Sequence, residues 1–145
     1  MRTIVTAVLL ALSIGSVSIG SVASAKDVDG AIPHAQLRAA DCIDTANIND
    51  WKIVDTRTAI VRTGPKRYLI KLQTSCPQLS HPPGLMFRTA TTAGPTAGRI
   101  CGGLGETVRS RGQPACAIQT VSMIDKAQYD QLSAEAEHNK QEKSH

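Results

Sequence analysis

The chain has 145 residues, which is enough for one domain, and aromatic side chains make up only 3% of it. Its formal net charge of +4 is mildly basic, and no row of aromatic residues accompanies the basic ones, so we expect no nucleic-acid binding. Beyond the N-terminal segment, no stretch is apolar for long enough to cross a membrane. These properties predict a small domain with a lean, mainly aliphatic core.

Residues 1–25 have the pattern of a secretory signal peptide. Arg2 supplies a positive start, residues 4–14 are mostly apolar, and a small-x-small cleavage motif ends at Ala25. The alternative, an uncleaved membrane anchor, is disfavoured because the apolar run is short and is diluted by serine and glycine. We therefore expect cleavage between Ala25 and Lys26, a periplasmic or secreted product, and no transmembrane segment after cleavage.

The mature chain divides into three parts. Residues 26–41 are expected to form a flexible lead-in, since Gly30 and Pro33 interrupt any long helix. A single β-rich domain follows over residues 42–132. Residues 133–145 are rich in charged and amide side chains and are expected to form a polar, flexible tail.

Short strand-like runs alternate with turn residues throughout the domain. The clearest pattern is a three-stranded meander, expected at 48–54, 58–63 and 68–72. Prolines exclude a regular element over residues 74–84. A buried strand is expected at 85–89 because it begins with leucine, methionine and phenylalanine.

Three more strands are expected, at 99–101, 105–110 and 116–123. Asp125 is placed to cap a short helix that begins at Lys126. The predicted fold class is therefore mainly β: a small disulfide-stapled barrel or sandwich of about six or seven short strands with a short C-terminal helix.

An even number of cysteines in a short exported chain is typical of a disulfide framework. The four are Cys42, Cys76, Cys101 and Cys116. They allow three pairings. We favour Cys42–Cys76 with Cys101–Cys116, which staples the meander and the C-terminal strands separately. The nested pairing, Cys42–Cys116 with Cys76–Cys101, closes the whole domain, and strand geometry does not decide between them.

Two other uses of the cysteines are disfavoured. Structural zinc sites usually contain close pairs such as C-x2-C, and the closest pair here is Cys101 with Cys116. A redox enzyme would need a C-x-x-C motif near a βαβ unit, which is absent. We expect no metal and no cofactor, although a metal-handling protein that uses reduced cysteines remains an alternative.

A small periplasmic hydrolase that uses Asp55, Glu106 or His81 is a second alternative. No G-x-S-x-G nucleophile elbow is present. Turns and strand edges explain Asp50 and Asp55 without chemistry, and an exposed loop explains His81. We therefore name no catalytic residue, and a non-enzymatic protein is favoured over an enzyme.

Basic residues gather on one predicted hairpin of the meander. They are Arg57, Arg62, Lys66, Arg67 and Lys71. Most charge clusters are a solvated face, but a functional role for this one would be to bind an anionic surface, such as a phospholipid head group or an acidic glycan.

The order of short motifs from Cys42 to Leu132 resembles a family of small, exported bacterial proteins of unknown function with a four-cysteine β domain. The motifs are Cys42-Ile43, Ile48-x-x-Trp51, Val54-Asp55-x-Arg57-Thr58, Arg67-Tyr68-Leu69 with Leu72, Cys76-Pro77-x-Leu79, Ile100-Cys101-Gly102, Gly105-Glu106 and Cys116-x-Ile118. One residue departs from the pattern, since Glu106 stands where we expect aspartate. The resemblance implies fold and location but no activity.

These observations lead to one functional hypothesis. We expect an exported, non-enzymatic β module that binds a partner, which would be an envelope protein, another envelope component or an anionic surface. The identity of the partner and the oligomeric state do not follow from the sequence.

Overall fold

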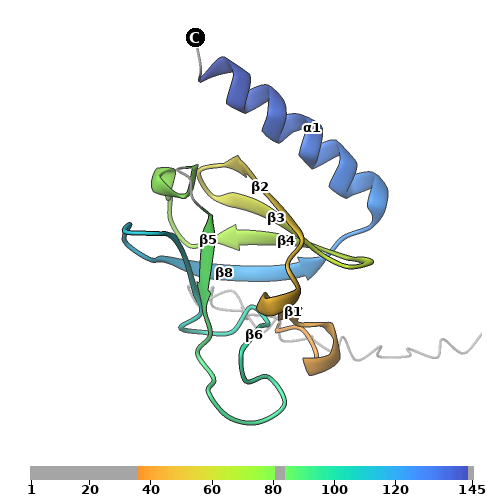
Figure 1. Ribbon diagram of the computed structural model, residues 1–145, viewed down its shortest axis with the longest axis vertical. Coiled ribbons are helices and arrows are strands. Elements are labelled where there is room, and N and C mark those ends of the chain that lie inside the picture. Colours follow the sequence, from red (N-terminus) through yellow and green to blue (C-terminus); the bar gives the residue numbers. More distant parts are fainter. Residues whose placement is uncertain (1–35, 81–83, 144–145) are drawn as a thin grey trace, which may run out of the picture. The chain divides into compact units, whose positions relative to one another are not determined.

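The computed structural model describes residues 36–80 and 84–143 (Figure 1). The predicted signal peptide, its cleavage site and His81 lie outside these ranges. The fold class is the one expected from the sequence: the described residues form a mainly β domain with eight strands and one C-terminal α-helix.

Six strands form one antiparallel sheet that curls into a half-barrel, in the order β2-β3-β4-β8-β7-β5. Their bounds are β2 Asp50–Asp55, β3 Thr58–Thr63, β4 Lys66–Leu72, β5 Leu85–Arg88, β7 Thr107–Ser110 and β8 Cys116–Met123. The strands β2 and β5 are therefore the two edges of this sheet.

The predicted meander is confirmed as β2-β3-β4. Its first turn is closed by Asp55, whose Oδ1 accepts a hydrogen bond from the Arg57 N–H at 2.6 Å. The second turn contains Gly64, which has a positive φ of 56°. Alternation then sends Tyr68, Ile70 and Leu72 of β4 to the same face, where all three are fully buried.

A second, two-stranded sheet pairs β1 (Ile43–Asp44) with β6 (Arg99–Ile100). Ile43 lies opposite Ile100, and neither side chain is exposed. Strand β1 was not expected, because two residues are too few to show an alternating pattern. Short 3₁₀ helices occupy Ala39–Asp41, Thr45–Asn47 and Pro77–Ser80. The last of them lies in the segment where we expected no regular element.

The β2-β3-β4 part of the sheet is covered on both faces. The inner face carries the main core, which includes Ala59, Val61 and Ile70. The outer face carries a smaller cluster in which Val54 and Ile60 pack against the helix α1 (Lys126–Glu142). Strand β3 is consequently buried on both sides.

Helix α1 is longer than expected, and the prediction of a flexible tail from residue 133 is wrong as far as Glu142. Asp125 caps the helix as predicted, by accepting a hydrogen bond from the Gln128 N–H. The polar C-terminal half is held by tertiary contacts: Ala136 is buried, and the Asn139 side chain donates to the Val54 carbonyl oxygen at 2.8 Å.

Strand β5 differs from its prediction in burial. It was expected to be a buried strand, but its side chains alternate between half-buried and exposed, and Met86 is 43% exposed. The reason is its position at the end of the strand order, where it pairs with β7 alone among the described strands. Apolar residue types at the start of a strand do not show whether that strand will have one neighbour or two.

Candidate functional site

All four cysteines are oxidised, in the pairs Cys42–Cys101 and Cys76–Cys116. The formation of two disulfides agrees with the sequence analysis, but the favoured pairing, Cys42–Cys76 with Cys101–Cys116, is wrong. The nested pairing is also not the one observed. Each bridge closes a loop that contains one cysteine of the other bridge.

The unexpected β1–β6 pairing explains the first bridge. Ile43 lies directly opposite Ile100, so the next residues outward, Cys42 and Cys101, also face each other, with 4.5 Å between their Cα atoms. The second bridge joins Cys76, just before a 3₁₀ helix, to Cys116 at the start of β8. Our prediction considered cysteines close in sequence, and the strand that pairs distant ones was too short to detect.

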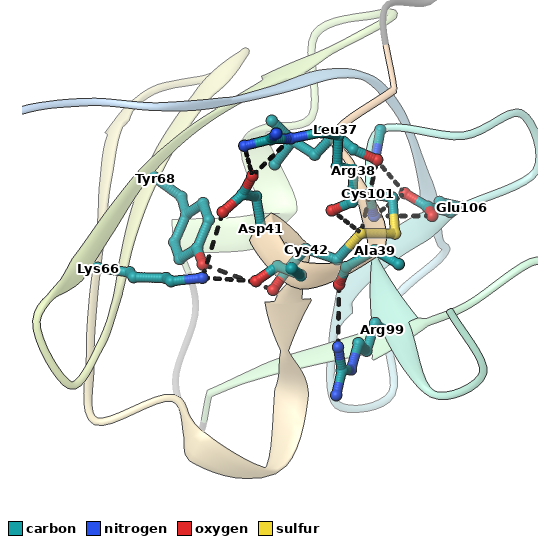
Figure 2. The surroundings of a disulfide bond; sticks show 12 residues. Leu37, Arg38, Ala39, Asp41, Cys42, Lys66, Tyr68, Arg99, Cys101 and Glu106 are labelled. Carbon is teal, nitrogen blue, oxygen red and sulfur yellow. Dashed lines mark hydrogen bonds and ion pairs between the residues drawn. A yellow bond between two sulfur atoms is a disulfide. The ribbon is translucent and has the colours of Figure 1, made fainter. Parts of the chain in front are cut away.

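Glu106 lies beside the Cys42–Cys101 bridge and is buried, with 5% of its surface exposed (Figure 2). Its carboxylate accepts hydrogen bonds from the backbone N–H groups of Cys101, at 2.9 and 3.1 Å, and Gly102, at 2.8 Å. Gly102 has a φ of +87°, and a Cβ there would lie 3.0 Å from the Val121 backbone nitrogen, so only glycine fits. Glu106 therefore stabilises this bend from inside the domain.

Residues 36–41 are held against the same bridge. The Leu37 N–H donates to the Cys101 carbonyl oxygen at 2.8 Å, and Arg99 donates to the Ala39 carbonyl oxygen at 2.9 Å. Hydrogen bonding from Arg38, together with the nearby Lys66, holds the pKa of Asp41 below its usual value. These residues are thus part of the domain and not of a flexible lead-in.

The five basic residues predicted as one patch fall into two groups. Arg57 and Lys71 lie at one end of the β3–β4 hairpin, whereas Arg62, Lys66 and Arg67 lie near its turn. At the first end, Arg57 donates to the carbonyl oxygens of Leu72 and Gln73, and the Lys71 ammonium donates to Thr58 Oγ1 at 2.7 Å.

Two residues of the group near the turn, Lys66 and Arg67, also make contacts within the domain. Lys66 donates to the Ala40 carbonyl oxygen at 2.5 Å and lies 3.4 Å from the Asp41 carboxylate. The Arg67 guanidinium lies 5.9 Å from the centre of the Tyr129 ring. The structure therefore does not assemble the five residues into one free basic surface, and their binding to an anionic surface stays a prediction.

Tyr129 connects helix α1 to strand β2. Its hydroxyl donates to Asp50 Oδ2 at 2.9 Å. Burial, and then the hydrogen bond with the Asp50 carboxylate, raise the pKa of Tyr129 to about 12. Sequence reasoning did not predict this contact, because nothing in the sequence connects positions 50 and 129.

Two further aspartates, the hydrolase candidate Asp55 and Asp44 of β1, stabilise local structure. Asp55 closes the first turn of the meander, and Asp44 caps a 3₁₀ helix by accepting from the Ala46 N–H. Within residues 36–80 and 84–143, no three or more histidine, cysteine, aspartate or glutamate side chains are grouped as metal ligands. No helix in the described part of the chain has the length and apolar character needed to span a membrane.

Charge is distributed very unevenly along the sequence, a signal that our sequence analysis missed. The segment 56–124 contains only one acidic residue, the buried Glu106. It contains nine basic residues: Arg57, Arg62, Lys66, Arg67, Lys71, Arg88, Arg99, Arg109 and Arg111. The surface built by this segment is therefore strongly positive.

Three of these arginines, Arg88, Arg109 and Arg111, are exposed on or beside the β5–β7 pair. None of their side chains forms an ion pair or a hydrogen bond with another residue of the described ranges. Strand register places Arg109 opposite Met86, so that Arg109 and Arg88 lie diagonally across the outward face of the pair. These three exposed side chains form a basic group that lies outside the predicted patch.

Comparison with known proteins gives a family but no activity. The model of a family of unknown function, DUF6491, matches residues 1–140. No curated protein matches the chain, and no solved structure matches it. The family match confirms the resemblance that the cysteine-framed motifs indicated.

Proposed function

We propose that this chain, which belongs to the DUF6491 family of unknown function, is an exported, non-enzymatic β module that binds an anionic partner or envelope component. The disulfides support the export part of this proposal. Both pairs are oxidised and all four cysteines are buried, and such bridges persist in oxidising compartments.

The non-enzymatic part of the proposal is supported by the carboxylates that a hydrolase would use. The Asp55 carboxylate closes a turn at 2.6 Å from a backbone N–H, and the Glu106 carboxylate accepts from two backbone N–H groups inside the domain. A general base needs a lone pair directed at the substrate. Both Glu106 carboxylate oxygens and Asp55 Oδ1 instead accept hydrogen bonds from the backbone of this chain.

The single observation that carries the binding function is the segregation of charge. Between Asp55 and Asp125 the only carboxylate is buried, whereas the side chains of three exposed arginines form no ion pair within the described structure. Unpaired surface charges of one sign raise the local concentration of oppositely charged molecules and speed their association. An anionic partner is therefore the chemistry that this surface fits best.

The test uses the disulfide-intact protein and three anionic probes: poly-L-glutamate, vesicles that contain phosphatidylglycerol, and a polyuronate. We expect at least one probe to bind in titration calorimetry at 50 mM salt, and to bind at least about tenfold more weakly at 300 mM salt. Vesicles of phosphatidylcholine serve as the neutral control. Absence of binding to all three anionic probes at low salt would contradict the proposed function.

A further inference from the structure

Strand β5 leaves one edge of the sheet open. It is the last strand in the order and pairs with β7 only, so alternate residues of Leu85–Arg88 direct their N–H and C=O groups away from the described sheet. Such an edge is a template for another extended chain. Within the described ranges, no side chain or helix forms a hydrogen bond to these backbone groups.

The two faces of β5 differ in chemistry. Leu85 and Phe87 point to the core side and are half-buried, packed against the main hydrophobic cluster. Met86 and Arg88 point outward and are exposed, with Arg109 beside them on β7. A strand added along β5 would therefore meet an apolar side and a positively charged side.

We infer that the open edge of β5 binds an extended, acidic polypeptide segment of a partner protein by strand addition. The segment would alternate apolar residues, which contact Leu85 and Phe87, with aspartate or glutamate residues, which pair with Arg88 and Arg109. Arg111, just after β7, extends the positive surface at the other end of the strand. This inference rests on the proposed anionic partner and specifies its class.

Charge and energy favour this occupant over two others. A second copy of the chain paired along β5 would bring two sets of arginines together with no acid between them, which is unfavourable. Attraction of three arginines to an anionic bilayer gives an affinity weaker than millimolar. A strand gains main-chain hydrogen bonds in addition to the charge pairs.

The probe is a fluorescent nonapeptide that alternates aspartate and valine, measured by fluorescence anisotropy with the disulfide-intact protein. One control peptide replaces aspartate by lysine. A second control keeps the side chains but carries N-methylated backbone amides, so that it retains the charge and loses its main-chain donors. We expect the first peptide to bind, and each control to bind at least about tenfold more weakly.

The protein variant is Arg88→Glu combined with Arg109→Glu, two exposed positions that leave the core unchanged. Its matched control is Lys143→Glu, an exposed residue at the far end of α1. We expect the double variant to lose at least about tenfold in affinity and the control to keep it. Amide exchange of residues 85–88 should slow when the peptide is bound.

Four results would overturn the inference. Equal affinity for the N-methylated and the unmodified peptide would show that charge attracts the peptide without strand addition. Slow exchange of β5 that depends on protein concentration alone would identify a second copy as the occupant. Binding to anionic vesicles or polyuronate without peptide binding would retain the proposed function and reject the strand. Failure of every anionic probe would reject both.

Discussion

The two edges of the six-stranded sheet are protected to very different extents. Strand β2 is covered by helix α1, which lies along that side of the sheet in Figure 1. The Asn139 side chain of this helix donates a hydrogen bond to the Val54 carbonyl oxygen of β2. A register shift between Ile53 and Asp55 also interrupts the ladder at its end. Strand β5 has no such cover among the described residues. Within residues 36–80 and 84–143, the fold therefore covers one edge of the sheet and leaves the other without a hydrogen-bonded neighbour.

The pairing of charged side chains also differs between the β2 edge and the β5 edge. At the covered edge, acidic and basic groups are paired: Lys52 lies 3.0 Å from Glu137 and holds the pKa of that carboxyl below its usual value. At the open edge, the Arg88 and Arg109 side chains form no ion pair within the described ranges. The covered edge thus has partners from helix α1, whereas β5 has neither a second strand nor an ion pair among the residues that the structure describes.

The largest expected effect comes from the disulfide that supports the β5 side. Replacing Cys76 and Cys116 together by serine should lower the free energy of unfolding by about 2–5 kcal/mol, because a bridge that closes a long loop restricts the unfolded chain. Urea unfolding measures this change. Amide exchange should accelerate in β7 and β5 more than in β2, if the bridge stabilises the open side selectively.

The matched control replaces Cys42 and Cys101 by serine. The two bridges span sequence separations of 40 and 59 residues, which makes their chain-entropy contributions differ by only about 0.3 kcal/mol. A larger difference in unfolding free energy between the two variants therefore measures how much each bridge stabilises the folded state. Unfolding free energies that change by less than about 1 kcal/mol in both variants would contradict a stapling role.

The next effect concerns the buried carboxylate on the segment that leads into β7. Glu106→Ala should lower the free energy of unfolding by about 1–3 kcal/mol, because the N–H groups of Cys101 and Gly102 lose their acceptor inside the domain. Thermal and urea unfolding measure the loss. Glu106→Gln keeps one acceptor oxygen and should lose less, so an equal loss in both variants would show that the charge matters more than the hydrogen bonds.

At the covered edge, Tyr129→Phe should cost about 1 kcal/mol, since it removes the hydrogen bond to Asp50 while keeping the ring. The pKa of Tyr129 is raised to about 12 from an ordinary value near 10. Its stabilising contribution is therefore complete below pH 10 and declines as pH rises from 10 towards 12.

The pH dependence separates this contribution from other titrations. We expect unfolding free energy to fall between pH 10 and pH 12 more steeply in the unmodified chain than in Tyr129→Phe, measured by short urea titrations. Parallel curves for the two proteins would show that the Tyr129 hydroxyl has an ordinary pKa in the folded state. The lysines are common to both proteins, so their titration cancels in the difference.

The smallest effect on stability is expected at the open edge. Met86→Lys changes an exposed side chain and should alter the free energy of unfolding by less than about 0.5 kcal/mol. It adds a charge to the edge strand, a common means of preventing edge-to-edge association. Light scattering at high protein concentration should therefore decrease, and an unchanged or increased signal would show that β5 does not limit solubility.

Sequence reasoning recovered the elements whose signals are local. The meander follows from alternation and from turn residues such as Asp55 and Gly64, and the helix start follows from the capping residue Asp125. The pairing of β1 with β6 could not be predicted, because each strand has two residues and more than fifty residues separate them. The disulfide pairing depends on that contact, so it was missed for the same reason.

The length of helix α1 and the contacts of individual side chains could not be predicted from local sequence patterns either. Helix α1 continues through a polar sequence because Ala136 and Asn139 contact the sheet, and neither residue type indicates such contacts. Lys66 and Arg57 bind backbone carbonyl oxygens that only the folded chain brings near them. The free arginines follow from the uneven distribution of acids and bases, which can be read from the sequence once the whole segment 56–124 is considered.

The interleaved order of the bridges has a consequence for biogenesis. A chain that enters an oxidising compartment N-terminus first presents Cys42 and then Cys76, yet these two are not partners in the folded domain. Oxidation in order of arrival would join them, and the native bridges would then require thiol–disulfide exchange. Cells that lack a disulfide isomerase should therefore accumulate less of this protein than of one whose consecutive cysteines are partners.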